Sequence, residues 1–117
     1  MNYSDLSDFE INKLVAKCEG FNLFKGCVTK SKSENWVRLT PYRNFDPCNN
    51  PSDAWPIILK NKISINCYKD GDSDYWESSS YDSKNNEKKR QFANDDKNPL
   101  RAAMIVYLMM EDAKNEV

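Results

Sequence analysis

The chain has 117 residues, of which 39% are hydrophobic and 30% charged, and a formal net charge of −1. A length of this order fits one compact domain, which we place over residues 1–117. The near-zero charge gives no general attraction to nucleic acid or to an anionic membrane. No stretch reaches the ~18 apolar residues of a membrane span, and the first residues lack a secretion signal. We therefore expect a cytoplasmic protein that binds neither nucleic acid nor membrane.

Histidine is absent, which excludes Ser-His and Cys-His nucleophilic pairs and histidine metal sites. The four cysteines form no CxxC pair of the kind that binds zinc: Cys18, Cys27, Cys48 and Cys67. Without a secretion signal, we expect reduced thiols and no metal or other cofactor. A hydrolase that uses carboxylates remains an alternative, although no spacing of acidic residues indicates one. We expect a protein that is not an enzyme.

The first predicted helix covers residues 8–19. Ser7 and Glu10 fit the S-x-x-E capping box, in which side chains accept hydrogen bonds from free backbone N–H groups. Gly20 follows the helix as a residue that readily takes a positive φ. Four apolar side chains recur at helical spacing and form one stripe: Ile11, Leu14, Val15 and Cys18.

The middle of the chain is strand-like at first and then rich in proline. Residues 21–24, 27–29 and 36–40 are β-prone, with a polar turn at 30–35. Residues 41–56 hold four of the five prolines, which cannot donate to a sheet ladder. We expect an irregular connection there, with Asn50 or Ser52 capping a single helical turn before Ile57.

A hairpin, a polar segment and a second helix are predicted next. Residues 63–68 and 75–79 are the strands of the hairpin, with Asp-Gly near the centre of the turn at 69–74. Asp70, Asp72 and Asp74 have the spacing that begins a calcium-binding loop, but the later ligand positions do not fit, so the turn is preferred. Residues 82–97 are mostly charged and predict a mobile loop. The final helix covers about residues 99–114.

These elements predict an α+β fold. The expected arrangement is a small antiparallel sheet of about four strands, with the N-terminal and C-terminal helices packed on one face. The open face of such a sheet would be covered by the Pro-rich connection or by a partner.

The chain resembles the NinX-like family of small uncharacterised proteins of lambdoid phages. The resemblance implies a phage or prophage accessory protein that works in the bacterial host cytoplasm, and it supplies no catalytic residues. It runs nearly from end to end of the chain and is carried by these segments: Ser4–Ser7, Val15–Gly20, Phe45–Pro47, Ser52–Ile58, Trp76 and Asn98–Met104.

A ligand site is one hypothesis for the start of the last helix. Asn98 is a favourable cap and Pro99 suits the first helical position. Arg101 lies where a cation opposes the helix dipole, so it either forms an anion site with free N–H groups or pairs with an acid such as Asp53 or Asp46.

Trp55 is the second candidate residue. Together with Asp53 it lies in the Pro-rich segment, where its ring either lines a ligand pocket or fills one end of the core. The hypothetical ligand site is therefore Arg101, Asn98, Asp53 and Trp55.

The last helix carries more apolar residues than one covered face needs. Val106, Met109 and Met110 extend the stripe around the helix, so the helix is either sandwiched or uses this surface as an interface. The leading functional hypothesis is a non-enzymatic protein that binds a host protein. A second copy of the chain is a further possible partner, which would give a homodimer. The alternative is a protein that binds a nucleotide or another small anionic metabolite.

Overall fold

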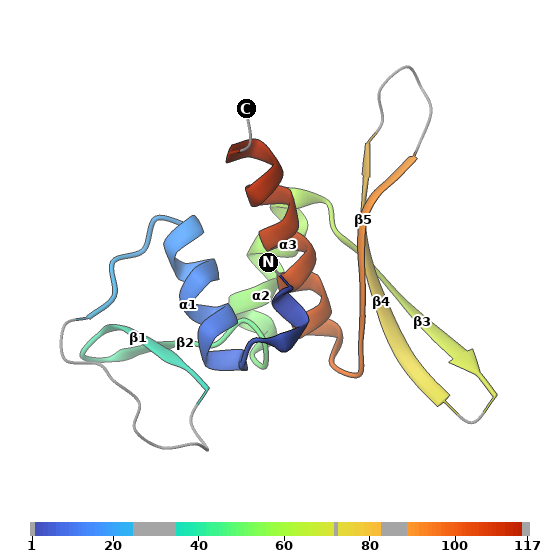
Figure 1. Ribbon diagram of the computed structural model, residues 1–117. Helices are drawn as coiled ribbons and strands as arrows, with labels where there is room; N and C mark the ends of the chain where they lie inside the picture. Colours follow the sequence, from blue (N-terminus) through green and yellow to red (C-terminus); the bar gives the residue numbers. More distant parts are fainter. Residues whose placement is uncertain (1, 25–34, 72, 83–88, 116–117) are drawn as a thin grey trace.

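The computed structural model describes residues 2–24, 35–71, 73–82 and 89–115. Figure 1 shows helices grouped on one side of a twisted three-stranded sheet, with a second, smaller sheet beyond them. The elements in chain order are the 3₁₀ helix η1 (Tyr3–Asp5), α1 (Asp8–Cys18), β1 (Val37–Thr40), β2 (Arg43–Phe45), α2 (Pro51–Asn61), β3 (Ser64–Asp70), β4 (Ser73–Asp82), β5 (Lys89–Asp96) and α3 (Pro99–Asn115).

The α+β class is confirmed, and the strands form two antiparallel sheets instead of one. Strands β1 and β2 pair with each other, and the larger sheet has the order β3-β4-β5. Strand β2 was missed because the prolines were read as excluding a ladder. Pro41 and Pro47 lie just outside β2 and leave its own N–H groups free to pair. The predicted strand at 27–29 and most of the turn at 30–35 lie outside the described residues.

The Pro-rich segment also contains a full helix, α2, where we expected one turn. Pro51 begins this helix, where the missing N–H would have no helical partner. The Asn50 side chain caps it by accepting a hydrogen bond from the Ser52 N–H at 3.0 Å. Pro56 lies inside the helix and removes one backbone hydrogen bond, and the helix nevertheless continues to Asn61.

The predicted loop at 82–97 is also corrected, because residues 89–96 form the edge strand β5. The polar composition of β5 gave no apolar–polar alternation in the sequence, but its side chains do alternate between the two faces of the sheet. Phe92 packs against the core, Asn94 accepts a hydrogen bond from Ser4, and Asp96 pairs with Arg101. The residues between them face the other side of the sheet. Residues 83–88 of the predicted loop lie outside the described residues.

The prediction for α1 is confirmed, and so is the hairpin, although its turn is shorter than the predicted 69–74 because β3 continues to Asp70 and β4 begins at Ser73. The Ser7 hydroxyl oxygen accepts a hydrogen bond from the Glu10 N–H at 3.1 Å. Gly20, at φ 79°, ends α1 in a Schellman motif, in which the Phe21 N–H bonds the Ala16 carbonyl. In the hairpin, Asp70 pairs with Ser73, so Gly71 is the first residue of a two-residue loop.

Helix α3 lies in the middle of the molecule (Figure 1), with β4 and β5 on one side and α1 and α2 on the other. Every side chain from Ala102 to Leu108 is buried, because a helix enclosed by two layers has no solvent face along that length. The sandwiched alternative therefore explains the surplus apolar residues. Val106 is 0% exposed, which corrects its assignment to an interface, whereas Met109 and Met110 are half-buried.

Candidate functional site

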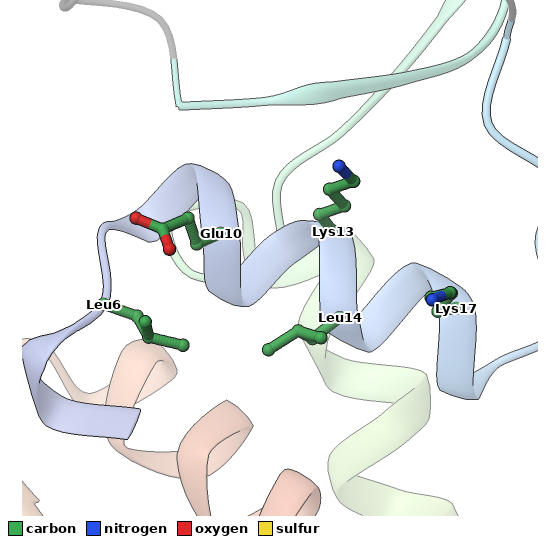
Figure 2. Close-up of a pocket in the computed structure, with 5 residues that line it drawn as sticks. All are labelled: Leu6, Glu10, Lys13, Leu14 and Lys17. Atoms are coloured by element: carbon green, nitrogen blue, oxygen red, sulfur yellow. The ribbon is translucent and has the colours of Figure 1, made fainter. Parts of the chain in front are cut away.

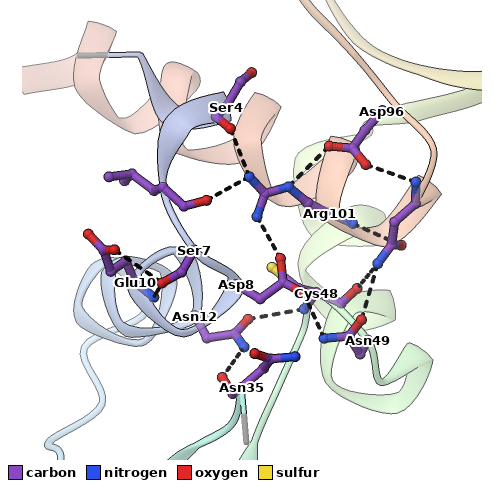
Figure 3. A network of polar contacts seen from close by, with 12 residues as sticks. Ser4, Ser7, Asp8, Glu10, Asn12, Asn35, Cys48, Asn49, Asp96 and Arg101 are labelled. Atoms are coloured by element: carbon purple, nitrogen blue, oxygen red, sulfur yellow. Dashed lines mark hydrogen bonds and ion pairs between the residues drawn. The ribbon is translucent and has the colours of Figure 1, made fainter. Parts of the chain in front are cut away.

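Arg101 is the centre of a polar network at the start of α3 (Figure 3). Its Nη1 lies 2.6 Å from Asp8 Oδ1, and its Nε lies 3.0 Å from Asp96 Oδ2. Its Nη2 donates to two backbone carbonyls, of Ser4 at 3.1 Å and of Leu6 at 2.8 Å. The Arg101 side chain is only 12% exposed, so these contacts replace most of its hydration. The guanidinium thus joins the N-terminal segment to α3 and to the end of β5.

Asn98 caps α3 as predicted and extends the same network. Its Oδ1 accepts hydrogen bonds from the N–H groups of Leu100 and Arg101, at 2.9 and 3.3 Å. Its Nδ2 donates to the Cys48 carbonyl at 2.7 Å, and its own N–H bonds Asp96. One asparagine therefore ties the helix start to the segment between β2 and α2.

A buried asparagine on α1 completes the network. Asn12 is 0% exposed, and its Nδ2 donates to the Asn35 carbonyl at 2.8 Å and to Asp46 Oδ1 at 2.6 Å. Its Oδ1 accepts a hydrogen bond from the Cys48 N–H at 3.1 Å. Both ends of the amide are paired, as burial of such a group requires.

The geometry gives Arg101 the role of an ion-pairing residue. Four hydrogen bonds use most of its five donors, and two carboxylates already offset its positive charge. An additional anionic ligand would meet the repulsion of Asp8 and Asp96. The sequence interpretation foresaw a pair with an acidic residue, but the partners are these two and not Asp53 or Asp46.

Asp53 and Trp55 both lie in α2 but have different surroundings. Asp53 Oδ2 accepts a hydrogen bond from the Asp46 N–H at 2.9 Å, which connects Asp53 to the border of the polar network. Trp55 is 55% exposed and lines a hollow between α2 and β3. Arg101 and Asn98 therefore belong to one network, and Asp53 is connected to it through Asp46. Trp55 lies in a different site.

The α2–β3 hollow has a volume of about 370 Å³ and is lined by Trp55, Ile58, Leu59, Lys62, Ile63 and Ile65. Trp55 and Leu59 are one helical turn apart, and both are more than half exposed. Lys62 is the one cation in this lining. Four of the six residues are isoleucine or leucine, so the surface favours apolar side chains with one neighbouring negative charge.

Lys62 has an unusual backbone at the edge of the hollow. Its φ of 52° places it in the left-handed region, where it ends α2 in a Schellman motif. The Ile63 N–H bonds the Ile58 carbonyl at 3.1 Å, which turns the chain directly into β3. Glycine would adopt this conformation with less strain than lysine.

Two further hollows have more charged side chains in their lining. The first, of about 330 Å³, lies along α1, and in Figure 2 the Leu6 and Leu14 side chains point toward one another across it. Its other lining residues are charged: Glu10, Lys13 and Lys17. The second, of about 420 Å³, lies at the turn end of the β3–β4 hairpin, where the Tyr68 and Tyr75 rings stack at 5.6 Å.

Several ionisable groups are held in their neutral form. Burial raises the pKa of Tyr3 and Tyr107, and the raised values are reinforced by hydrogen bonds to Asp112 and Glu19. Burial also raises the pKa of the Cys48 thiol. Cys18 is more exposed, yet partial desolvation and the nearby charge of Glu111 raise its pKa as well. A thiol with a raised pKa is less often deprotonated near neutral pH and is therefore a poorer nucleophile.

Cys18, Cys48 and Cys67 are free thiols, and only Cys48 of these three is buried. Within the described ranges, no cluster of cysteine and acidic side chains could hold a metal ion. The same part of the chain contains no helix that is long and apolar enough to cross a membrane.

The chain matches a known protein family over residues 2–111, and the family is described as Bacteriophage P22, NinX. The chain belongs to this family. The resemblance to NinX-like proteins, based on segments from Ser4 to Met104, is thereby confirmed. No curated protein matches the chain. Family membership identifies a phage protein and assigns no activity to any residue.

Sequence reasoning missed several residues that complete the two sites of this NinX-family chain. Asp8 and Asn12 lie one turn apart on α1, a spacing that could have indicated a polar stripe beside the apolar one. Asp96 precedes the Asn-Pro helix start by two positions, a distance at which its carboxylate accepts from the Asn98 N–H. Leu59 and Ile65 in the hollow gave no signal, because α2 was expected to be one turn long.

Proposed function

We propose that this phage-family protein acts by binding a host protein in the bacterial cytoplasm, without catalysing a reaction. The observation that supports a binding role is the α2–β3 hollow with its two exposed apolar side chains. Trp55 and Leu59 expose 55% and 57% of their surface on one face of α2. An exposed tryptophan beside an apolar depression is typical of protein-binding surfaces, where Trp is among the residues that contribute most affinity.

The alternative proposal is a small anionic ligand, such as a nucleotide, bound by Arg101, Asn98, Asp53 and Trp55. The ion pairs of Arg101 with Asp8 and Asp96 argue against an anion at the helix start. What favours a small ligand is that Trp55 lines a hollow, together with the cation of Lys62. A thermal-shift screen with nucleotides tests this alternative, and a screen in which no nucleotide raises the melting temperature would end it.

A homodimer through α3 is the remaining partner proposal. Since Val106 is buried, this interface would have to use Met109 and Met110, which are half-buried in the second half of α3. Light scattering of the protein and of Met109→Glu distinguishes the cases. A dimer that the substitution dissociates supports the interface, whereas a monomer in both samples contradicts it.

Affinity capture from host lysate tests the main proposal when it is made with matched variants. Leu59→Asp places a charge in the centre of the exposed apolar surface. Tyr42→Ala is the control, because Tyr42 is 99% exposed and does not line the hollow. We expect a host protein that the unmodified chain and Tyr42→Ala retain and that Leu59→Asp loses. If Leu59→Asp keeps the same partners with a normal melting temperature, this surface is not the binding site.

A further inference from the structure

Strand β3 is an edge strand next to the α2–β3 hollow. It pairs with β4 on one side, and no strand in the described part of the chain pairs with its other side. It runs seven residues without proline and without a break in its register to β4. Long, regular edges are usually protected by bulges, prolines or covering segments, because they readily accept another strand.

The alternation of the ladder indicates which backbone groups of β3 point outward. The pair next to a two-residue hairpin loop exchanges hydrogen bonds, and here that pair is Asp70 and Ser73. Counting back along β3, every second residue bonds β4, ending with Ser64. The Ser64 carbonyl also accepts a hydrogen bond from the Ser78 hydroxyl of β4 at 3.1 Å, which agrees with a Ser64 carbonyl that faces β4. The N–H and C=O groups of Ile65, Cys67 and Lys69 therefore point away from β4.

The side chain of Ile65 connects this edge to the hollow. Ile65 lines the hollow and packs against the core, so it is on the helix side of the sheet. A residue that pairs opposite Ile65 on an added strand would point to that same side. An added strand would thus form backbone hydrogen bonds to β3 and insert alternate side chains toward Trp55 and Leu59.

We propose that the β3 edge and the α2–β3 hollow together bind an extended segment of a partner polypeptide, which adds to the sheet as a fourth strand. The segment carries apolar side chains at alternate positions, because the hollow is lined mainly by isoleucine and leucine. It also carries an acidic residue, because Lys62 is the cation of that lining. This inference rests on the proposed function and specifies the form in which the partner binds.

The test begins with a displayed library of random linear peptides selected on the full chain and counter-selected on Leu59→Asp. We expect the retained peptides to share alternating apolar residues and one acidic residue. Synthetic peptides from this selection then serve as the probes. Amide hydrogen exchange followed by NMR should show new protection at Ile65, Cys67 and Lys69 on peptide binding. The neighbouring amides of Asn66 and Tyr68, which already bond β4, should change little.

N-methylated peptides provide a matched control with the unmodified protein. Methyl groups on alternate peptide nitrogens should weaken binding at least about tenfold in the register that faces β3, which is about 1.4 kcal/mol, because each methyl group removes a hydrogen bond to β3. Methyl groups in the other register should leave the affinity nearly unchanged. Equal effects in both registers would exclude strand addition.

The remaining outcomes separate this inference from the proposed function. Peptides that depend on Leu59 but leave β3 exchange unchanged would overturn strand addition and leave the binding surface intact. A selection that yields no Leu59-dependent peptide would overturn both. Protection of the Cys67 amide in the free protein, together with a dimeric mass in sedimentation, would show that a second copy of the chain occupies the edge.

Discussion

Asp8 and Arg101 are 93 positions apart in the sequence, and their carboxylate and guanidinium lie 2.6 Å apart in the structure. Asp8 is the first residue of α1, and Arg101 is in the first turn of α3. A negative charge near a helix start interacts favourably with the helix dipole, and a positive charge there interacts unfavourably. The favourable interaction of Asp8 with the dipole of α1 therefore offsets the unfavourable interaction of Arg101 with the dipole of α3. The contact therefore fixes the two helix starts relative to each other.

We predict that Arg101→Leu lowers the free energy of unfolding by about 3 kcal/mol, because it leaves two partly buried carboxylates without their counter-charge. Arg101→Lys should cost less, about 1–2 kcal/mol, since it keeps the charge and loses the fork that reaches both acids. Urea titration measures both values. Lys114→Ala is the control, because its pair with Glu111 is exposed and should contribute about 0.5 kcal/mol or less. A loss for Arg101→Leu no larger than this control would contradict the assigned role.

Asn12 gives a second prediction, about a neutral group. Asn12→Leu fills a similar volume but leaves the Cys48 N–H and the Asp46 carboxylate without this partner. We expect a loss of about 2–3 kcal/mol, the cost of unpaired buried polar groups. Lys13→Leu on the exposed face of α1 is the matched control and should change stability by less than about 0.5 kcal/mol. Calorimetry of both variants distinguishes a structural amide from an incidental one.

Alkaline pH should destabilise the protein in two ranges. Burial raises the pKa of Cys48 and Tyr107 in the folded state, so above the unfolded pKa values the unfolded chain binds fewer protons and stability falls with pH. The Cys48 contribution is complete below about pH 8.5 and is lost above it, and the tyrosine contribution is lost above about pH 10. Each group adds a slope of up to about 1.4 kcal/mol per pH unit.

Two variants separate these ranges in denaturant titrations at a series of pH values. Cys48→Ala should flatten the decline that begins near about pH 8.5, of which Cys18 preserves part because its pKa is raised as well. Tyr107→Phe should flatten the steeper decline above about pH 10. Tyr3, which bonds Asp112, should preserve part of the second decline. Unchanged slopes in both variants would show that other groups control alkaline unfolding.

Lys62→Gly should stabilise the fold by about 0.5–1 kcal/mol, because glycine takes the left-handed conformation at the end of α2 without the strain of a side chain. The same substitution removes the cation of the α2–β3 hollow. We therefore expect a higher melting temperature together with weaker binding of acidic peptides. A gain in stability with unchanged peptide affinity would remove Lys62 from the binding surface and leave the helix-end argument intact.

How far the sequence predicted this structure depended on the kind of signal. Local chemistry placed α1 and α3 within one residue of their observed bounds, because Ser7, Gly20 and Asn98 act on neighbouring backbone groups. Strand β5 was missed because most of its residues are polar on both faces. The polar residues on its helix side can be told from the others only by their contacts in the folded structure, such as the pair of Asp96 with Arg101. The partners of Arg101 were missed for the same reason, since Asp8 is distant in sequence.

The α2–β3 hollow shows a different limit. The sequence left open whether Trp55 lines a pocket or fills one end of the core, and the structure places it at a hollow. Its neighbours Leu59 and Ile65 depend on the length of α2 and on the edge position of β3. Both follow from tertiary packing, which can override the local effect of Pro56. Residue-type reasoning therefore identified one residue of this surface and not its extent.

The central position of α3 also determines when the protein can fold during translation. Helices α1 and α2 and the large sheet pack on α3, and all of them precede it in the chain. Until residues 99–115 have left the ribosome, α1 and α2 have apolar faces, and β5 has Phe92, without the element that covers them. Nascent chains that stop before Asn98 should therefore remain protease-sensitive and dependent on chaperones, and the emergence of α3 should bring the whole molecule together in one late step.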